Sequence, residues 1–313
     1  MKIPNINARH LLTVTDLTGP EIISLFRFTD HLKKTLREGK EHAYLKGKIL
    51  AMIFEKRSTR TRVSFEAGII QLGGHGIFLS SDDIQIGRGE TIADTARVLS
   101  RYVNGIMIRT YSHDIIEELA ANSAISVING LTDTYHPCQA LTDFFTIYER
   151  KRDLKGIKLT YVGDGNNMAN SLLLGGSLLG VDVSVAAPKG YQPEKEIVRR
   201  SEELGAISGA RIDVTDDIDR AVAEANYLYT DVWVSMGQER EAAAKKKALK
   251  KYKITARMLA KCAPGCLVMH CLPAHRGEEI DDDVIDSDRS IVFDQAENRL
   301  HMQKALMSAL LSR

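Results

Sequence analysis

Short apolar runs alternate along the chain with longer segments in which apolar residues recur every three or four positions. This alternation predicts an α/β protein whose sheets are mostly parallel and flanked by helices. Nine runs read as strands, and they fall into two groups, so each half of the chain should form its own sheet. The predicted strands are 48–54, 75–80, 104–110 and 125–130 in the first half, and 158–164, 181–188, 226–232, 266–272 and 290–295 in the second.

The boundary between the two halves is expected near residue 150. A chain of 313 residues is too long for one ordinary core, and two domains of roughly 150 residues are the natural division. A helix from about Gln139 to Arg150 leads into a charged turn that ends at Gly156, where the next strand begins. The last stretch, 296–313, has apolar residues at helical spacing and therefore needs a surface to cover.

One segment, "KILAMIFEKRSTRTRVSFEAGIIQLGG", predicts a strand, a turn and a helix in succession. Helical spacing places Val63, Ala67, Ile70 and also Phe65 on its buried face, with residues 58–61 at the helix start.

The start of this helix predicts an anion site. Its free backbone N–H groups, the hydroxyls of Ser58, Thr59 and Thr61, and the guanidinium of Arg60 would together form a pocket of phosphate size. Cations are disfavoured at a helix N-terminus, so a bound oxyanion would explain the concentration of arginine here. The alternative is that Ser58 only caps the helix while the arginines point to solvent.

Further polar residues of the first half lie near predicted strand ends, where α/β sheets bind their ligands. Arg109 closes one strand, His136 and Gln139 follow another, and Gln85 lies in a loop. Taken singly, each of these residue types is more often a surface or packing residue than a ligand-binding one. Together they supply a guanidinium, an imidazole and two amides, a set suited to holding a phosphate and polarising a neighbouring carbonyl.

In the second half, Cys271 follows a strand and precedes a proline, which places its sulfur at a strand end. A buried, inert thiol is the alternative. A zinc site is the weaker interpretation, because a Pro-Gly turn separates the two cysteines and no paired C-x2-C is present. Its ligands would be Cys262, Cys266, His270 and His275.

Two other segments of the second half carry candidate chemistry. "YVGDGNNMANSLL" predicts a strand, a glycine-rich turn and a helix, but Met168 stands where a dinucleotide site needs a small residue. The amides of Asn166 and Asn167 are instead suited to a small carboxylate. Asp231 ends a strand, where it could pair with a substrate ammonium, and the turn Ser235–Gly237 follows.

Composition restricts the partners. Lys+Arg 42 against Asp+Glu 41 leaves a net charge of +1, which gives no general reason to expect a nucleic acid or a membrane surface as partner. The lysine-rich segment 239–253 is expected to be a solvated helix face, although a polyanion site is the alternative. No apolar run is long enough to span a bilayer, and no signal segment is evident at the start. Four cysteines are too few for a disulfide framework, which agrees with a reducing compartment. We therefore expect a cytoplasmic protein.

Four motifs in this order and at these distances, "STRTR", "HPCQ", "DVWVSMG" and "HCLP", resemble those of the ornithine carbamoyltransferases. The resemblance covers essentially the whole chain. "STRTR" and "HPCQ" are shared with the wider carbamoyltransferase family, including the aspartate-specific branch. "DVWVSMG" with "HCLP" is the more specific pair, because in the family these segments contact ornithine.

The resemblance implies a role for each matching residue, with Arg60, His136 and Cys271 as the catalytic ones. Asn167, Asp231, Ser235 and Met236 would hold ornithine, whereas Cys271, Leu272 and Arg299 would border the carbamoyl phosphate where the two substrates meet. Gln85 would reach the site of an adjacent subunit. Carbamoyl phosphate would be held by Ser58, Thr59, Arg60, Thr61, Arg109, His136, Pro137, Cys138 and Gln139.

The resemblance also implies a carbamoyl phosphate domain of residues 1–150, completed by the C-terminal helix 296–313 packed back on it, and an ornithine domain of residues 151–295. The expected reaction transfers the carbamoyl group to the δ-amine of L-ornithine, giving citrulline and phosphate in arginine metabolism, without a metal or organic cofactor. A homotrimer or a multiple of trimers is expected. The alternatives are another amine substrate, such as putrescine, aspartate or N-acetylornithine, and a second activity in polyanion binding.

Overall fold

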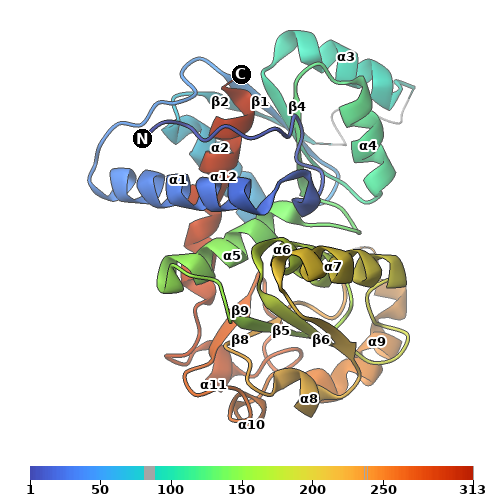
Figure 1. The fold of residues 1–313 in the computed structure, drawn as a ribbon. Coiled ribbons are helices and arrows are strands. Elements are labelled where there is room, and N and C mark those ends of the chain that lie inside the picture. The colour runs from blue at the N-terminus through green and yellow to red at the C-terminus, as the bar shows by residue number, and fades with distance from the viewer. Residues whose placement is uncertain (81–88, 236, 238, 313) are drawn as a thin grey trace. The chain divides into compact units, whose positions relative to one another are not determined.

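The computed structural model describes residues 1–80, 89–235, 237 and 239–312, and it divides the chain into two compact units (Figure 1). Unit 1 comprises Met1–Phe145 and Asn298–Arg313, and unit 2 comprises Thr146–Glu297. Each unit contains its own parallel sheet flanked by helices, which confirms the predicted α/β class. Helices α5 and α12 each contribute residues to both units.

Unit 1 is built on a four-stranded sheet in the order β2-β1-β3-β4, in which every pairing is parallel. Strand β1 is buried along nearly its whole length, as expected for a parallel strand covered on both faces. The elements of this part of the chain are η1 (Val14–Asp16), α1 (Gly19–Arg37), β1 (Ile49–Phe54), α2 (Thr59–Gln71), β2 (His75–Ser80), α3 (Ile92–Tyr102), β3 (Gly105–Arg109), α4 (His113–Asn122), β4 (Ser126–Leu131) and α5 (Pro137–Lys151).

The strand order of this sheet reverses between β1 and β3. From β1 the chain first moves outward to β2 and then returns to the opposite side of β1 to form β3. At such a switch point the two adjacent strands send their following segments in opposite directions, which leaves an opening at their carboxyl ends. Helix α2 starts at the end of β1, so its N-terminus lies at this opening.

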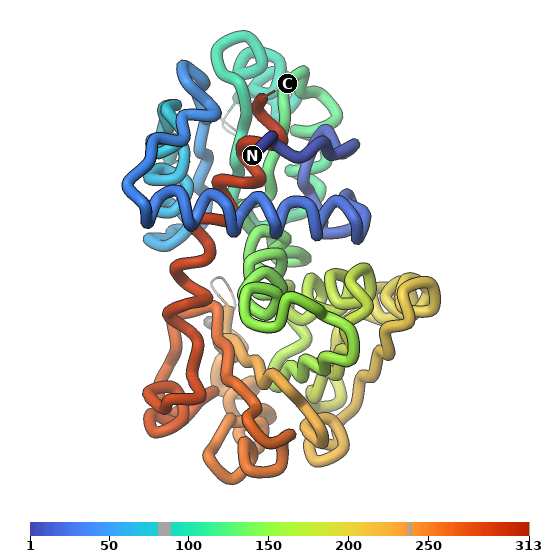
Figure 2. Tube along the Cα trace, turned by 60° about the vertical axis from the view of Figure 1, so that its left-hand side comes forward, coloured from blue at the N-terminus to red at the C-terminus, as the bar shows by residue number. Residues whose placement is uncertain are grey.

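The C-terminal helix α12 (Val292–Leu311) packs against α1 (Figure 2). The hydroxyl of Thr29 donates to the sulfur of Met302, and the buried Lys33 Nζ donates to Asn298 Oδ1 at 2.6 Å. The predicted packing of the C-terminal helix on the first unit is therefore confirmed. Among the described residues, no helix is both long enough and apolar enough to cross a membrane.

Unit 2 is built on a five-stranded parallel sheet in the order β7-β6-β5-β8-β9. Its order reverses between β5 and β8, which makes the carboxyl ends of these two strands the switch point of the second sheet. The elements are β5 (Lys158–Val162), α6 (Asn167–Leu179), β6 (Asp182–Ala186), α7 (Lys195–Ser208), β7 (Ile212–Thr215), α8 (Ile218–Val222), β8 (Tyr227–Thr230), η2 (Glu239–Glu241), α9 (Ala242–Leu249), η3 (Lys250–Tyr252), α10 (Ala256–Leu259), β9 (Leu267–His270) and α11 (Asp282–Ile285).

One predicted strand is wrong, and one strand of the structure was not predicted. The run 290–295 is not a strand: Ser290 makes an isolated bridge to Val268, and α12 begins at Val292. The apolar run was too short to distinguish the two-residue period of a strand from the 3.6-residue period of a helix. The helical period continues through the buried Gln295. Conversely, the edge strand β7 was missed, because Ile212–Thr215 is short and only partly buried.

The predicted buried face of α2 was right for Phe65 but wrong for Val63 and Ile70. Val63 and Ile70 are 58% and 59% exposed, and the face that packs inward carries Phe65 and Ile69. The reason lies in Gly68, which is also buried: a Cβ atom there would lie 2.9 Å from the Met307 side chain of α12. The missing side chain lets the two helices approach closely, and this contact decides which of the two possible apolar faces is covered.

Lys304 of α12 is fully buried next to the end of α2. Its Nζ lies 2.9 Å from Gln71 Oε1 and 3.0 Å from His42 Nε2. Burial lowers the pKa of Lys304 to about 8. Since the charged ammonium is desolvated here, it opposes folding at neutral pH.

This environment predicts how stability depends on pH. A lysine in the unfolded chain titrates near ~10.4, so between about pH 8 and 10 the unfolded chain binds more protons and stability gains with rising pH. The penalty present below pH 8 is on the order of 2 to 3 kcal/mol. We expect Lys304→Met to melt at a higher temperature than the wild type near pH 7, and we expect this difference to shrink toward pH 10. Calorimetry across this pH range measures it. Lys34→Met, which changes an exposed lysine of α1, is the control. Parallel curves for wild type and Lys304→Met would contradict the assignment.

Candidate active site

The first group of candidate functional residues begins at the N-terminus of α2. Ser58 is the N-cap of this helix, and its Oγ accepts from the Thr61 backbone N–H at 3.2 Å. The helix start predicted at residues 58–61 is therefore confirmed. Both arginines that flank this segment, Arg57 and Arg62, are exposed, whereas Arg60 is half-buried. The capping interpretation is thus right for the serine, but Arg60 does not extend fully into solvent.

Arg299 connects this helix start to the start of α5. It is 4% exposed, and its Nη1 donates to Gln139 Oε1 at 2.7 Å while its Nη2 donates to Thr61 Oγ1 at 2.8 Å. Gln139 in turn donates through Nε2 to Asp143 Oδ1 at 2.7 Å. Three segments far apart in the sequence are thereby held together by one buried guanidinium.

His136 precedes α5 and is buried within reach of three guanidinium groups. Burial lowers the pKa of His136 well below its usual range, and the positive charges of Arg299, Arg109 and Arg60 lower it further. The imidazole is therefore neutral at pH 7, so it can donate a hydrogen bond without adding to the local positive charge. This concentration of cations is suited to an anion with more than one negative charge.

The other residues predicted to bind carbamoyl phosphate, Arg109, Pro137 and Cys138, take part in the hydrogen bonding or packing of the fold itself. Arg109, at the end of β3, is 8% exposed, and its carbonyl accepts from the Glu55 N–H at 2.9 Å. Cys138 donates through Sγ to the Asn129 carbonyl at 3.3 Å, and burial raises the pKa of its thiol to about 12. Pro137 is the first residue of α5 and has no N–H to offer. Any contact of Pro137 or Cys138 with a ligand would therefore be through the backbone or by packing.

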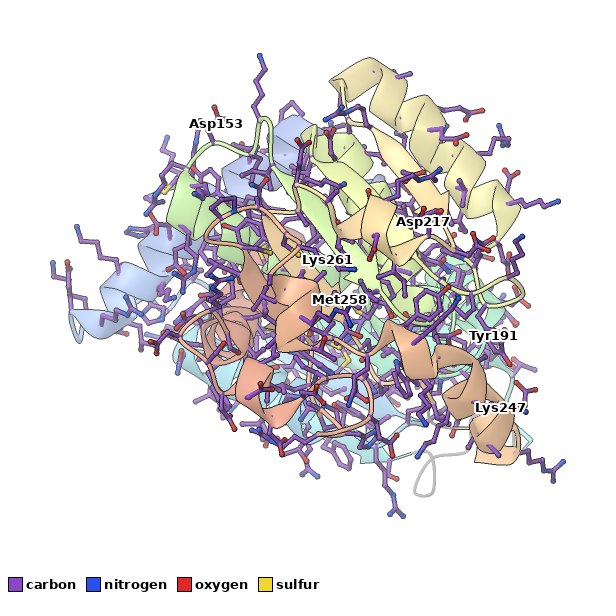
Figure 3. The ribbon with its side chains drawn as sticks, turned by 90° about the horizontal axis from the view of Figure 1, so that it is seen from below. Asp153, Tyr191, Asp217, Lys247, Met258 and Lys261 are labelled. Carbon is purple, nitrogen blue, oxygen red and sulfur yellow. The ribbon has the colours of Figure 1, made fainter. Side chains whose placement is uncertain are left out.

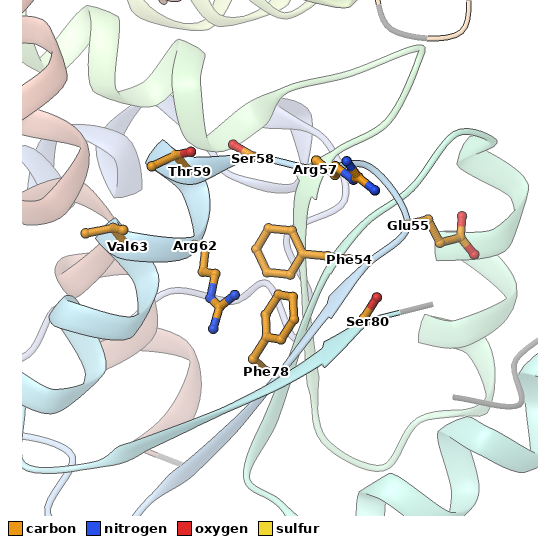
Figure 4. Close-up of a pocket in the computed structure, with 9 residues that line it drawn as sticks. All are labelled: Phe54, Glu55, Arg57, Ser58, Thr59, Arg62, Val63, Phe78 and Ser80. Atoms are coloured by element: carbon orange, nitrogen blue, oxygen red, sulfur yellow. The ribbon is translucent and has the colours of Figure 1, made fainter. Parts of the chain in front are cut away.

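A cavity of about 450 Å³ opens beside the start of α2 (Figure 4). Ser58 and Thr59 line it on one side, and the rings of Phe54 and Phe78 line it on another, with centroids 5.4 Å apart. The Arg62 guanidinium lies 3.8 Å over the Phe78 ring. Gln85 lies outside the described residues.

A second group of functional residues lies at the switch point of the second sheet. Asp231, which follows β8, is 7% exposed and accepts three hydrogen bonds. Its Oδ1 accepts from the Val232 N–H at 2.8 Å and from Cys271 Sγ at 2.9 Å, and its Oδ2 accepts from Asn166 Nδ2 at 2.9 Å. The ends of β5, β8 and β9 therefore meet at one carboxylate.

Asn166 caps helix α6 and does not point its amide away from the protein. Its Oδ1 accepts from the N–H groups of Met168 and Ala169, and from the Tyr161 hydroxyl at 3.2 Å. The amide suggested by the sequence as a carboxylate ligand is thus occupied on both sides, by this cap and by Asp231. Asn167 is the first residue of α6 and is 9% exposed, at the helix end where an anion is stabilised.

The turn after β9 is held by a buried imidazole. The Leu272 N–H donates to His270 Nδ1 at 2.8 Å, so the other ring nitrogen, Nε2, carries the hydrogen and donates to Glu279 Oε1 at 3.2 Å. Both His270 and Glu279 are fully buried. Leu272 has a φ of 57°, which non-glycine residues rarely adopt. This network fixes the backbone on which Cys271 presents its sulfur to Asp231.

Gly165 fixes the turn after β5. A Cβ atom at this position would lie 2.3 Å from the backbone nitrogen of Pro193, and the Gly165 N–H donates to the Tyr191 carbonyl at 2.7 Å. The turn that carries Asn166 is therefore pressed against another segment of the same unit.

The zinc interpretation is not supported by the positions of its four predicted ligands. In the described ranges, His270 clusters with Asp231 and Cys271, whereas His275 clusters with two glutamates. The Sγ atoms of Cys262 and Cys266 lie near backbone carbonyls, of Met258 and Leu267 respectively.

Of the predicted ornithine residues, Ser235 is half-buried, and Met236 lies outside the described residues.

Sequence reasoning missed one buried ion pair next to Asp231. The segment 239–253 was expected to be solvated, but Lys245 is 5% exposed, and its Nζ lies 2.6 Å from Asp164 Oδ2. Within this segment, Lys245 and Leu249 are buried and four residues apart, a helical spacing that could have indicated a covered stripe.

Two family models match almost the entire chain. Residues 9–149 match the carbamoyl-P binding domain of aspartate/ornithine carbamoyltransferase, and residues 155–310 match the Asp/Orn binding domain. The chain belongs to the aspartate/ornithine carbamoyltransferase family. The resemblance predicted from the four motifs is therefore confirmed.

Individual carbamoyltransferases are similar over nearly the full length. The ornithine carbamoyltransferase of Bacillus thuringiensis subsp. konkukian is 54% identical over 310 residues, which cover 99% of this chain and 96% of the relative. That of Oceanobacillus iheyensis is 55% identical over 307 residues, covering 98% and 95%. The solved structure of the Pyrococcus furiosus ornithine carbamoyltransferase superposes with a TM-score of 0.94 at 50% identity, covering 97% of each chain.

The buried position of His136 yields a prediction for this carbamoyltransferase. We expect the imidazole of His136 to be neutral at pH 7 in the ligand-free protein, because burial and three guanidiniums lower its pKa. Inorganic phosphate should raise its pKa, since a nearby anion stabilises the imidazolium. Nuclear magnetic resonance of ¹⁵N-labelled histidine tests both points, with the exposed His75 as a reference signal. A His136 pKa at or above about 6.5 without ligand, or no change with phosphate, would refute this account.

Proposed function

We propose that this protein is an ornithine carbamoyltransferase, which transfers the carbamoyl group of carbamoyl phosphate to the δ-amine of L-ornithine and releases citrulline and phosphate. The single observation that carries the proposal is the pairing of two different sites in one chain. A buried cationic site occupies the switch point of the first sheet, and a carboxylate in contact with a thiol occupies that of the second. The full-length similarity to proteins named ornithine carbamoyltransferase supports the same conclusion.

Carbamoyl phosphate binds at the start of α2. Its phosphate accepts hydrogen bonds from the N–H groups and hydroxyls of residues 58–61, and the guanidiniums of Arg60 and Arg109 neutralise its charge. His136, as a neutral donor, binds the carbamoyl oxygen. Arg299 reinforces the positive field and holds Thr61 and Gln139 in place, as its two hydrogen bonds to them suggest.

Ornithine binds at the switch point of the second sheet, with Asp231 as the group that selects a cationic substrate. A buried carboxylate attracts the ammonium groups of ornithine and repels the second carboxylate of aspartate. Asn167 at the N-terminus of α6 and the Ser235–Met236 segment bind the amino-acid end. The charge of Asp231 thus favours ornithine over aspartate.

The reaction begins with loss of a proton from the δ-ammonium, whose free pKa of about 10.4 keeps it charged at neutral pH. Asp231 and Cys271 orient this nitrogen, and their 2.9 Å contact places a carboxylate and a thiol together where a proton must be moved. The amine then attacks the carbamoyl carbon, forming a C–N bond. Arg60 and His136 stabilise the developing oxyanion, each by roughly 3 to 4 kcal/mol. The C–O bond to phosphate breaks, the attacking nitrogen loses its extra proton to the departing phosphate, and phosphate remains bound by the cations that held the substrate.

The working form is a homo-oligomer, a trimer or a multiple of trimers, in the cytoplasm. The exposed apolar side chains of Val63 and Ile70 on α2 and Ile77 on β2 provide a surface suited to a subunit interface. A reducing compartment is consistent with the four cysteines, which are all free thiols.

A substrate comparison tests the function. With carbamoyl phosphate in excess, we expect citrulline from L-ornithine at a kcat/KM at least a hundredfold above the values for carbamoylation of putrescine, N-acetylornithine and aspartate. A colorimetric ureido assay measures all four products. Preference for any of the other three amines would overturn the assignment to ornithine.

The cationic site is tested by Arg60→Ala. We expect kcat to fall by at least a hundredfold, because the variant loses a charged donor to the transition state, while the melting temperature changes little, since this side chain is only half-buried. The control is Arg97→Ala, which removes the same charge from an exposed position on α3 of the same unit. Turnover of Arg60→Ala within threefold of the wild type would exclude this role.

A further inference from the structure

Lys245 differs from the lysines that follow it in sequence. Lys246 pairs at the surface with Glu278, and Lys247, labelled in Figure 3, is exposed. Lys245 is instead turned inward on α9, 5% exposed, with its ammonium 2.6 Å from the carboxylate of Asp164. An ammonium buried against one carboxylate is costly to separate from it, because either charge left alone would be desolvated without compensation.

Asp164 connects this lysine to the predicted ornithine site. It follows β5, and β5 pairs directly with β8, after which Asp231 lies. Burial raises the pKa of Asp164, the Lys245 ammonium counteracts this effect, and the negative charge of Asp231 raises it further. The two carboxylates are thus close enough to repel each other, and Lys245 neutralises the one that does not contact Cys271.

The segment between these two anchors carries the predicted ornithine residue Ser235. At its first end, Asp231 is fixed by the Val232 N–H, Asn166 and Cys271. At its other end, α9 is fixed to Asp164 by Lys245. Asp231 and α9 are therefore each held at a carboxylate that follows one of two neighbouring strands of the sheet, and the described residues 232–235 lie between them in sequence.

We propose that Lys245 is a positioning residue for the amino-acid substrate: it anchors α9 to the carboxyl edge of the sheet, and it neutralises Asp164, so that Asp231 is the carboxylate that meets the substrate's ammonium group. The proposal rests on the proposed function. It adds a determinant outside the residues that contact substrate. Without Lys245, α9 would lose this anchor, and the buried Asp164 would become a carboxylate without its cation, close to Asp231.

Steady-state kinetics of Lys245→Met test this role. Methionine keeps the length and the apolar stem of lysine but removes the ammonium. We expect the KM for ornithine to rise at least tenfold, while the KM for carbamoyl phosphate stays within twofold and kcat falls less than the ornithine KM rises. Lys246→Met, the neighbouring surface lysine, is the matched control and should leave all three constants within twofold. Lys245→Arg, which keeps the charge, should restore most of the ornithine affinity.

The double variant Asp164→Asn/Lys245→Met keeps the test informative if the single variant folds poorly. It removes both buried charges, so it should regain stability, yet it should still show the raised ornithine KM because the anchor is missing. An ornithine KM within twofold of the wild type in a folded Lys245→Met or double variant would overturn the proposal. An equal rise in both substrate constants would do the same. Failure of the wild-type protein to form citrulline would instead refute the proposed function.

Discussion

The strand order of the two parallel sheets is the constraint on which the rest of the structure depends. In each sheet the first strand has later strands on both of its sides, so the order reverses once. The connections on the two sides lead away from each other, and the carboxyl ends of two adjacent strands are left uncovered. Candidate residues of both groups lie at these positions, residues 58–61 and Arg109 after β1 and β3, and Asn166 and Asp231 after β5 and β8. The chemistry of the two sites differs, but their location has the same physical cause.

The first site depends on holding like charges close together. Arg60, Arg109 and Arg299 all act electrostatically on the buried His136. Such an arrangement opposes folding unless each guanidinium is well hydrogen-bonded, and Arg299 shows how this is achieved, through Thr61 and Gln139. A bound anion would weaken the repulsion among these positive charges, which favours anion binding at this site.

Much of this organisation could be predicted from the sequence, for local reasons. The strand ends, the helix start at Ser58 and the position of Asp231 follow from short patterns of apolar residues, caps and breakers. The errors occurred where a contact between distant segments decides the outcome. The covered face of α2 depends on the contact between Gly68 and α12, and the burial of Lys245 depends on Asp164. Neither partner can be identified from the local pattern, because both alternatives satisfy helical spacing equally well.

The glycine turn after β5 limits how the selectivity of this enzyme can be redesigned. Because any side chain at Gly165 would overlap the backbone of Pro193, the turn that carries Asn166 cannot be varied at this glycine without a shift of the backbone. Libraries that vary this position would return mainly misfolded proteins. Diversity is better introduced at Ser235, which no strand or helix includes and which is only half-buried, so that new side chains there leave the scaffold of the proposed amine site intact.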